Sequence, residues 1–315
     1  MSDPAGVDTA FRAAMAQAVG DGPATRLGVA VSGGPDSMAL LDMATNAFPG
    51  RVMAATVDHG LRPESADEAA MVGRWCATRG VAHETLHPAS RPDGNIQSWA
   101  RSARYALLND WRIRHGMDWL LTAHHADDQM ETMLMRMNRG AGLSGLAGIR
   151  PRNGAIVRPL LDCRKGDLLD YAMARALPFV TDPSNADPRF DRAALRARLA
   201  QADWLDPRAA ARSAAALSEC DAALDWVVAD LTARHVSRQG DAFRLDRTDL
   251  PRELLRRLLL HMLRRADSAV APPRGDAVDR LIALALAGGK GSIGDWLLAG
   301  GPHGWTLSPA PPRRT

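Results

Sequence analysis

The sequence predicts an α/β fold, with an open, mainly parallel, doubly wound sheet followed by a smaller, mainly helical second domain. Up to about residue 161, short apolar runs alternate with helix-length segments, which is typical of repeated strand–helix units. Three polar clusters each follow one of the predicted strands. The chain has 315 residues, more than one domain usually holds, and from Asp162 onward its pattern becomes helical.

The first predicted strand, residues 27–31, has the length and β-branched content of a buried parallel strand. It leads into Ser32-Gly33-Gly34-Pro35-Asp36-Ser37, and residues 38–47 have the pattern of a helix. Free backbone N–H groups and the helix dipole favour an anion at such a helix start. The segment therefore predicts a phosphate-binding loop. The alternative is that the glycines make a turn and the polar side chains only cap the helix.

This loop differs from a Walker loop, because Asp36 stands where that motif has a lysine. A carboxylate beside a phosphate would be repelled unless a cation lies between them. Mg²⁺ is commonly held by one or two carboxylates together with substrate phosphates. We therefore expect Asp36 to bind Mg²⁺.

The other elements of the first domain follow in order. A weak helical pattern in residues 1–22 predicts a packing helix, and residues 140–148 are too rich in glycine for a stable helix, which predicts a flexible loop beside the site. In the rest of this domain we expect strands at residues 51–57, 81–86 and 119–123 and a further strand within 155–161. We expect helices at residues 65–78, 95–115 and from about 124 to 138.

We expect three parts in the chain. Residues 1–190 form the sheet domain, 191–238 a helical connector, and 239–315 a small C-terminal domain. In this last part the pattern predicts a short strand at 239–245, helices at 252–265 and 277–287, and a disordered tail from residue 309.

The second and third polar clusters begin at Asp58 and at His124. Because ligands of open parallel sheets bind outside the carboxyl ends of the strands, both clusters are expected to converge with the loop. Asp127 and Glu131 share a helix face and Asp128 is displaced from it, so these carboxylates suit Mg²⁺ or proton transfer, unless they only complement the helix dipole. The adjacent His124 and His125 lack the His-x-x-x-His spacing of a zinc site.

Composition excludes some classes of protein. No apolar stretch approaches the ~20 residues that span a bilayer, and residues 1–20 lack the pattern of a signal peptide, so a cytoplasmic protein without membrane contact is expected. Cys76, Cys163 and Cys220 are isolated, which indicates no disulfide framework. The chain after residue 190 is net positive and rich in arginine. Arginine suits phosphate contacts, although a compositional preference would give the same bias.

Seven segments, in order, resemble the motifs of the tRNA-isoleucine lysidine synthetases, a family of N-type ATP pyrophosphatases with a PP-loop. The segments are 32–37, 57–62, 101–105, 122–132, 136–148, 158–161 and 182–196. One position departs from the pattern, since Ala193 stands where the last block usually has Asn. Beyond Arg196 the resemblance is faint.

The resemblance implies an ATP-dependent ligase. ATP would adenylate the C2 oxygen of the wobble cytidine in an isoleucine tRNA with a CAU anticodon, releasing pyrophosphate. Free L-lysine would then attack C2 and displace AMP, giving lysidine and changing the codon read from AUG to AUA. ATP and Mg²⁺ are the implied cofactors.

The resemblance also implies roles for individual residues. It implies no particular lysine-binding residue. It also implies no obligate protein partner, and whether the protein forms a homodimer is left open. The metal ligands would be Asp36 and Asp128. The catalytic residues would be Asp36, Arg104, His124, Asp128 and Arg196. ATP would be bound by Ser32, Gly33, Gly34, Pro35, Asp36, Ser37, Val57 and Asp58.

Two other functions are weighed against this one. A tRNA-thiolating enzyme of the same superfamily would carry a Cys-x-x-Cys pair, and this sequence has none. A catalytically silent tRNA-binding protein would keep the fold without the chemistry. The intact loop and the carboxylates Asp127, Asp128 and Glu131 argue against it.

Overall fold

The computed structural model describes residues 4–19, 25–60, 64–89, 96–181, 191–199, 201–267 and 275–311. The chain forms two compact units, Met1–Ser218 and Glu219–Thr315. The three-part division at 190 and 238 stays a prediction; within 191–238 the structure has two helices, α8 (Asp191–Leu199) and α9 (Pro207–His235). Among the described residues, none of the helices is both long and apolar enough to cross a membrane.

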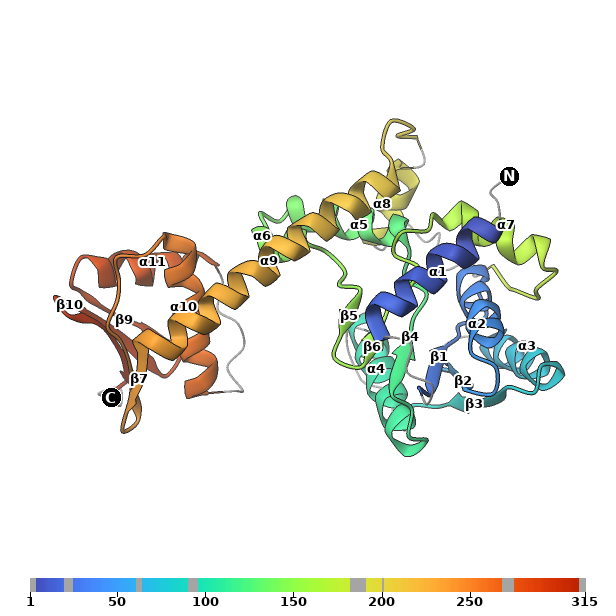
Figure 1. Ribbon diagram of the computed structural model, residues 1–315, viewed down its shortest axis with the longest axis horizontal. Helices are drawn as coiled ribbons and strands as arrows, with labels where there is room; N and C mark the ends of the chain where they lie inside the picture. The colour runs from blue at the N-terminus through green and yellow to red at the C-terminus, as the bar shows by residue number, and fades with distance from the viewer. Residues whose placement is uncertain are drawn as a thin grey trace. The chain divides into compact units, whose positions relative to one another are not determined.

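The first unit is built on a six-stranded sheet in the order β3-β2-β1-β4-β6-β5 (Figure 1). All neighbouring strands pair parallel except β5 and β6, which form an antiparallel hairpin. The chain leaves β1 toward β2 and β3 and later returns to its other side, so the fold class is confirmed as doubly wound. The strands are β1 (Leu27–Ala30), β2 (Val52–Val57), β3 (Ala82–Leu86), β4 (Trp119–Leu121), β5 (Arg152–Asn153) and β6 (Ile156–Val157).

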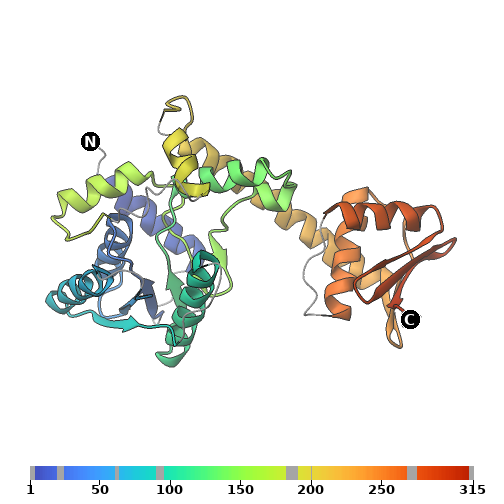
Figure 2. The same ribbon diagram turned by 180° about the vertical axis from the view of Figure 1, so that it is seen from behind.

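Helices cover both faces of this sheet, as the two opposite views show (Figures 1 and 2). Because side chains alternate along a strand, Leu121 packs in one core with α1, α2, α3 and α7, while Leu120 packs in another with Trp111 of α4. The helices are α1 (Pro4–Val19), α2 (Pro35–Ala47), α3 (Glu64–Thr78), α4 (Ile96–Arg114), α5 (Ala126–Met137), α6 (Leu143–Leu146) and α7 (Lys165–Ala174).

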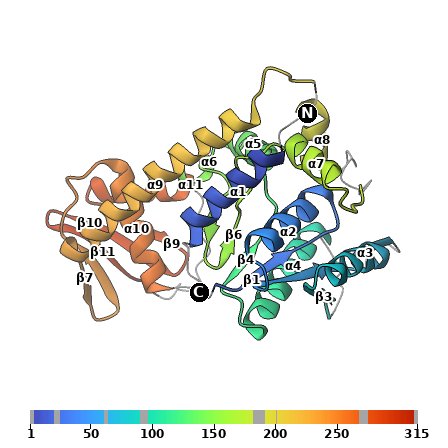
Figure 3. The same cartoon turned by 45° about the vertical axis from the view of Figure 1, so that its right-hand side comes forward.

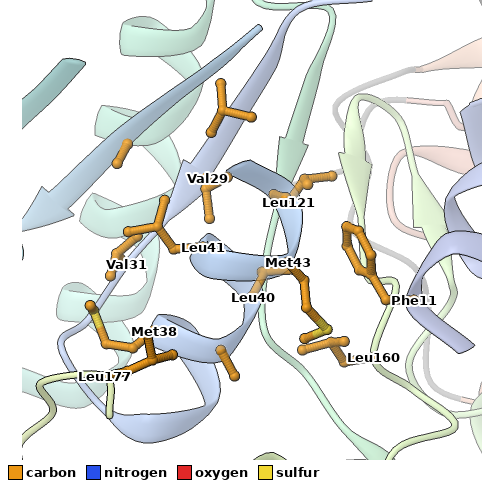
Figure 4. Close-up of a cluster of buried hydrophobic side chains, with 14 of the residues drawn as sticks. Phe11, Val29, Val31, Met38, Leu40, Leu41, Met43, Leu121, Leu160 and Leu177 are labelled. Atoms are coloured by element: carbon orange, nitrogen blue, oxygen red, sulfur yellow. The ribbon is translucent and has the colours of Figure 1, made fainter. Parts of the chain in front are cut away.

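Figure 4 shows the first of these cores, to which α2 contributes Leu40, Leu41 and Met43. The predicted packing helix at the N-terminus is confirmed as α1, since its Phe11 and Met15 are buried in the same core. Buried on two sides, β1 and α2 form a rigid support for the loop between them.

The glycine-rich segment 140–148 is not the helix-free loop that its composition predicts. It contains the short helix α6, and two side chains of α5 hold its backbone. The Gln129 side chain accepts from the Ile149 N–H at 2.6 Å and donates to the Ile149 carbonyl at 3.2 Å. Arg136 Nη1 donates to the carbonyls of Gly145 at 2.8 Å and Gly148 at 3.0 Å. Long-range hydrogen bonds thus supply the order that glycine itself does not.

The second unit contains a five-stranded antiparallel sheet in the order β7-β8-β11-β10-β9. Its helices lie on one face of the sheet, where Phe243, Leu298 and Trp305 share a core with them (Figure 3). The elements are the C-terminal part of α9, α10 (Arg252–Ala266), α11 (Gly275–Leu286), β7 (Val236–Gln239), β8 (Ala242–Leu245), β9 (Lys290–Ile293), β10 (Trp296–Gly301) and β11 (Gly304–Pro309).

The predicted helices of this unit are confirmed as α10 and α11, but most of its sheet was missed. The strand expected at 239–245 is a hairpin of β7 and β8, and the segment from Lys290 to Pro309 forms three more strands. These strands were not predicted because they contain glycines, which are unfavourable in strands. A Cβ on Gly300 would meet the Ala285 carbonyl of α11, and one on Gly304 the Leu245 carbonyl of β8. The expected disordered tail began too early, because Pro309 ends β11; residues 312–315 lie outside the described residues.

Candidate active site

The loop after β1 is shaped as an anion site. Helix α2 begins earlier than predicted, with Gly34 as its N-cap and no side chain capping its free N–H groups. Ser37 Oγ accepts from the Ser32 N–H at 3.2 Å and donates to the Gly34 carbonyl at 2.9 Å. Gly33 has φ +84°, which favours glycine, and its carbonyl accepts from the Val180 N–H at 2.9 Å. The loop is therefore fixed with backbone donors left for a phosphate.

Asp36 lies in the first turn of α2 and is mostly buried. Its Oδ2 is 3.6 Å from His125 Nε2, while its Oδ1 is buried and makes no hydrogen bond. Burial raises the pKa of Asp36, and the positive charges of His125 and Lys165 only partly offset this. A buried carboxylate oxygen without a partner is costly unless a cation meets it, so this oxygen suits a bound metal ion.

His125 connects the loop to α5, a role that no sequence motif predicts. It is the N-cap of α5, where its N–H donates to Asp128 Oδ2 at 3.2 Å. Its buried ring lies 3.5–3.6 Å from carboxylate oxygens of Asp36, Asp127 and Asp128. Burial alone would lower the pKa of His125, but the hydrogen bond with Asp127 and the charges of Asp128 and Asp36 raise it. The N-cap position before Ala126-Asp127-Asp128 was the available signal for this residue.

Two arginines join α8 to α5. Arg196 Nε donates to Glu131 Oε1 at 2.6 Å and its Nη2 to Asp128 Oδ1 at 3.2 Å. Arg192 Nη2 donates to Thr132 Oγ1 at 2.7 Å. Helix α8 thereby neutralises the carboxylates of α5. Ala193, the departure from the family pattern, is buried.

His124 stands at the end of the segment after β4, with Nδ1 3.0 Å from Thr122 Oγ1. Burial lowers the pKa of His124 to about 4. The charge of Asp128 opposes this, and three positive charges add to it, those of Arg158, Arg101 and Arg192. The imidazole is therefore neutral at neutral pH and acts as an uncharged hydrogen-bonding group.

Arg104 lies on α4, exposed, and has no hydrogen bond or ion pair within the described chain. Its charge acts on His59, whose pKa is lowered by burial and by the Arg104 charge. The α4 arginine whose charge reaches His124 is Arg101, one turn earlier. The structure thus brings Asp36, Asp128 and Arg196 together around His125, and the role of Arg104 stays a prediction.

Asp58 directly follows Val57, the last residue of β2. Its Oδ1 accepts from the Gly60 N–H at 2.8 Å and from Ser65 Oγ at 2.6 Å. Burial would raise the pKa of Asp58, but these two hydrogen bonds and the charge of His87 lower it overall. Asp58 therefore ties the end of β2 to α3, and its expected role with Val57 in ATP binding stays a prediction.

Known proteins resemble this chain in sequence and in fold. The model of the PP-loop domain family matches residues 7–203. The tRNA(Ile)-lysidine synthase of Zymomonas mobilis subsp. mobilis is 40% identical over 299 residues, covering 92% of this chain and 90% of that protein. The tRNA(Ile)-lysidine synthase of Novosphingobium aromaticivorans is 41% identical over 301 residues, covering 93% and 91%.

Among solved structures, the U34-tRNA thiolase NcsA from Methanococcus maripaludis with its [4Fe-4S] cluster is similar in fold. It has a TM-score of 0.54 at 18% identity and covers 68% of this chain and 80% of its own. In this chain Cys76 and Cys163 are buried and Cys220 is exposed in the other unit, so the likeness extends to the fold alone. By the extent of its matches, the chain belongs to the tRNA(Ile)-lysidine synthase family and carries a PP-loop domain.

Proposed function

We propose that this protein uses ATP to join free lysine to C2 of the wobble cytidine in an isoleucine tRNA with a CAU anticodon, releasing pyrophosphate and AMP. The observation that carries the proposal is the convergence at one sheet edge. The phosphate loop after β1 and the Asp128–Arg196 pair after β4 are separated only by His125. Family membership supports the identity of the product.

The residues present fit a magnesium ion. Asp36 Oδ1 has no partner, and each oxygen of Asp128 retains a lone pair beside its hydrogen bond. Mg²⁺ is commonly held by one or two carboxylates together with substrate phosphates, and Asp36 and Asp128 would supply those carboxylates. When bound, Mg²⁺ would neutralise charge between the carboxylates and the phosphates.

The protein's own groups then act by position and charge. The start of α2 holds the phosphates. Arg196 orients Asp128, and the neutral ring of His124 hydrogen-bonds the cytidine. A pKa of about 4 makes His124 a weak base. Among the carboxylates of α5, Glu131 is the better candidate for accepting the proton that lysine loses before attack, because burial raises the pKa of Glu131.

The second unit, in this proposal, contacts the tRNA backbone through its arginines. The protein works in the cytoplasm, where ATP, lysine and tRNA are present together. A homodimer stays a prediction that the mass in solution would decide.

The test compares two transcripts. With the CAU transcript, ATP and lysine, we expect pyrophosphate release and a wobble nucleotide with the mass of lysidine. A transcript with uridine at that position should react roughly 10⁴-fold more slowly, because a carbonyl replaces the amino donor and leaves buried partners unpaired. Equal ATP consumption with both, a sulfur-containing product, or no pyrophosphate release would refute the proposal.

A further inference from the structure

Arg158 follows β6 and lies beside the chain segment that carries His124. Strands β4 and β6 pair parallel with Leu121 opposite Val157, and the Thr122 N–H donates to the Val157 carbonyl at 3.0 Å. Arg158 therefore directly follows the last residue of β6, at the same edge of the sheet as the residues that follow β4. Its charge is close enough to help lower the pKa of His124.

The Arg158 side chain is buried but incompletely bonded, with 8% of the residue exposed. Nη1 donates to the Arg150 carbonyl at 2.8 Å, and Nε is buried with no partner among the described residues. Nη2 also has no hydrogen bond within this part of the chain, and it is not among the buried unpartnered atoms, so it keeps contact with solvent. Within the described chain, no carboxylate lies within 4 Å of this guanidinium. A buried cation without an anionic partner is costly, so this guanidinium favours an anionic ligand.

We propose that Arg158 binds the α-carboxylate of the amino-acid substrate, an inference that rests on the function proposed above. The planar guanidinium matches a carboxylate and can bind it through two parallel hydrogen bonds. The bond to the Arg150 carbonyl holds one end of the group in place, which leaves Nε and Nη2 along the remaining edge.

Position favours a carboxylate over a phosphate. In the sheet order β6 lies two strands from β1, so the end of β6 is roughly 10 Å from the end of β1 at the usual strand spacing. The phosphates already have the start of α2. Lysine must bring its ε-amine to the carbon that ATP activates, which leaves its carboxylate a side chain's length away. Arg158, at the end of β6, is far enough from the phosphate loop to bind the carboxylate while the ε-amine reaches the activated carbon.

The test separates the two chemical steps. For Arg158→Met we expect the KM for lysine to rise about 10- to 100-fold, from loss of hydrogen bonds to a charged group. Adenylation of the tRNA, measured as single-turnover pyrophosphate release without lysine, should stay within about twofold. Cadaverine, which is lysine without the carboxylate, should react equally well with the variant and the wild type.

Arg152→Met is the matched control on the same hairpin, because Arg152 is exposed and lies over the Trp119 ring at 4.2 Å. It should leave the KM for lysine unchanged. Arg158→Lys should restore part of the affinity, and retained adenylation excludes misfolding of the variant. An unchanged lysine KM in Arg158→Met, or equal losses in adenylation and with cadaverine, would overturn the inference. If the wild type itself forms no lysidine, the proposed function fails instead.

Discussion

Each unit contains a group of charged side chains that is at least partly buried, and the two groups differ in how completely they are bonded. In the second unit all three nitrogens of Arg257 have carboxylate partners: Nε with Glu253 at 3.0 Å, Nη1 with Asp225 at 2.7 Å and Nη2 with Asp221 at 2.6 Å. In the first unit, Asp36 Oδ1 and Arg158 Nε are buried and have no hydrogen-bond partner among the described residues. Both groups carry the desolvation cost of buried charge, but only the second offsets it within the chain.

The difference separates groups that hold the fold from groups that await a substrate. A closed set of ion pairs joins α9 to α10 and leaves nothing for a ligand. An open set is tolerated where a metal ion, phosphate or carboxylate supplies the missing partners. Substitutions in the two groups should therefore have different consequences.

The largest expected effect is on catalysis by the first unit. Asp36→Asn should lower tRNA-dependent pyrophosphate release on the order of 10²- to 10³-fold, because a preorganised charge is removed where the metal and phosphates meet. The unfolding temperature should stay near that of the wild type. Steady-state pyrophosphate release and thermal unfolding measure the two quantities.

Asp42→Asn is the matched control for that variant, because Asp42 lies on the same helix and is also buried. It accepts from Tyr171 Oη at 2.9 Å and from Asn46 Nδ2 at 3.0 Å. Asn at position 42 should lower the unfolding temperature and spare the rate of the folded enzyme. Near-normal turnover of Asp36→Asn in saturating Mg²⁺ would remove the metal role from that residue.

The next effect is on stability of the second unit. Arg257→Met should destabilise the protein by on the order of 3 kcal/mol, since it removes the guanidinium that pairs with the buried Asp221 carboxylate. Urea unfolding followed by tryptophan fluorescence would report it, because Trp305 is buried in the core of this unit. A midpoint equal to the wild type's would contradict the view that this group holds α9 and α10 together.

The fold of the first unit was predictable because its signals are local. A buried strand, a glycine-rich turn and the start of a helix are encoded by consecutive residues, so each unit can be recognised locally. Parallel strands then place the starts of these helices at one edge of the sheet. His125, Arg101 and Arg158 were missed because their importance comes from neighbours distant in sequence. The sheet of the second unit was missed for a related reason. Gly300 and Gly304 are needed because the backbones of Ala285 and Leu245 lie too close for a side chain, and these contacts between distant residues leave no local sequence pattern.

The smallest expected effect concerns the uncovered face of the second sheet. Arg244 and Lys290 lie in one cross-strand row, through Thr306 and Ala299, on the face opposite the core. Neutralising both with Gln should weaken tRNA binding several-fold and reduce the slope of log affinity against log salt by about 2, if each contacts a phosphate. Filter binding over a range of salt measures this slope, and an unchanged slope would remove this face from the RNA interface.

The most direct test of the comparison is backbone hydrogen exchange with and without ATP and Mg²⁺. The two segments to follow are residues 33–38, at the open site, and α10, which carries Arg257. If the open charges of the first unit await ligands, exchange should slow in residues 33–38 and stay unchanged in α10. Equal protection of both segments, or none at residues 33–38, would contradict this account.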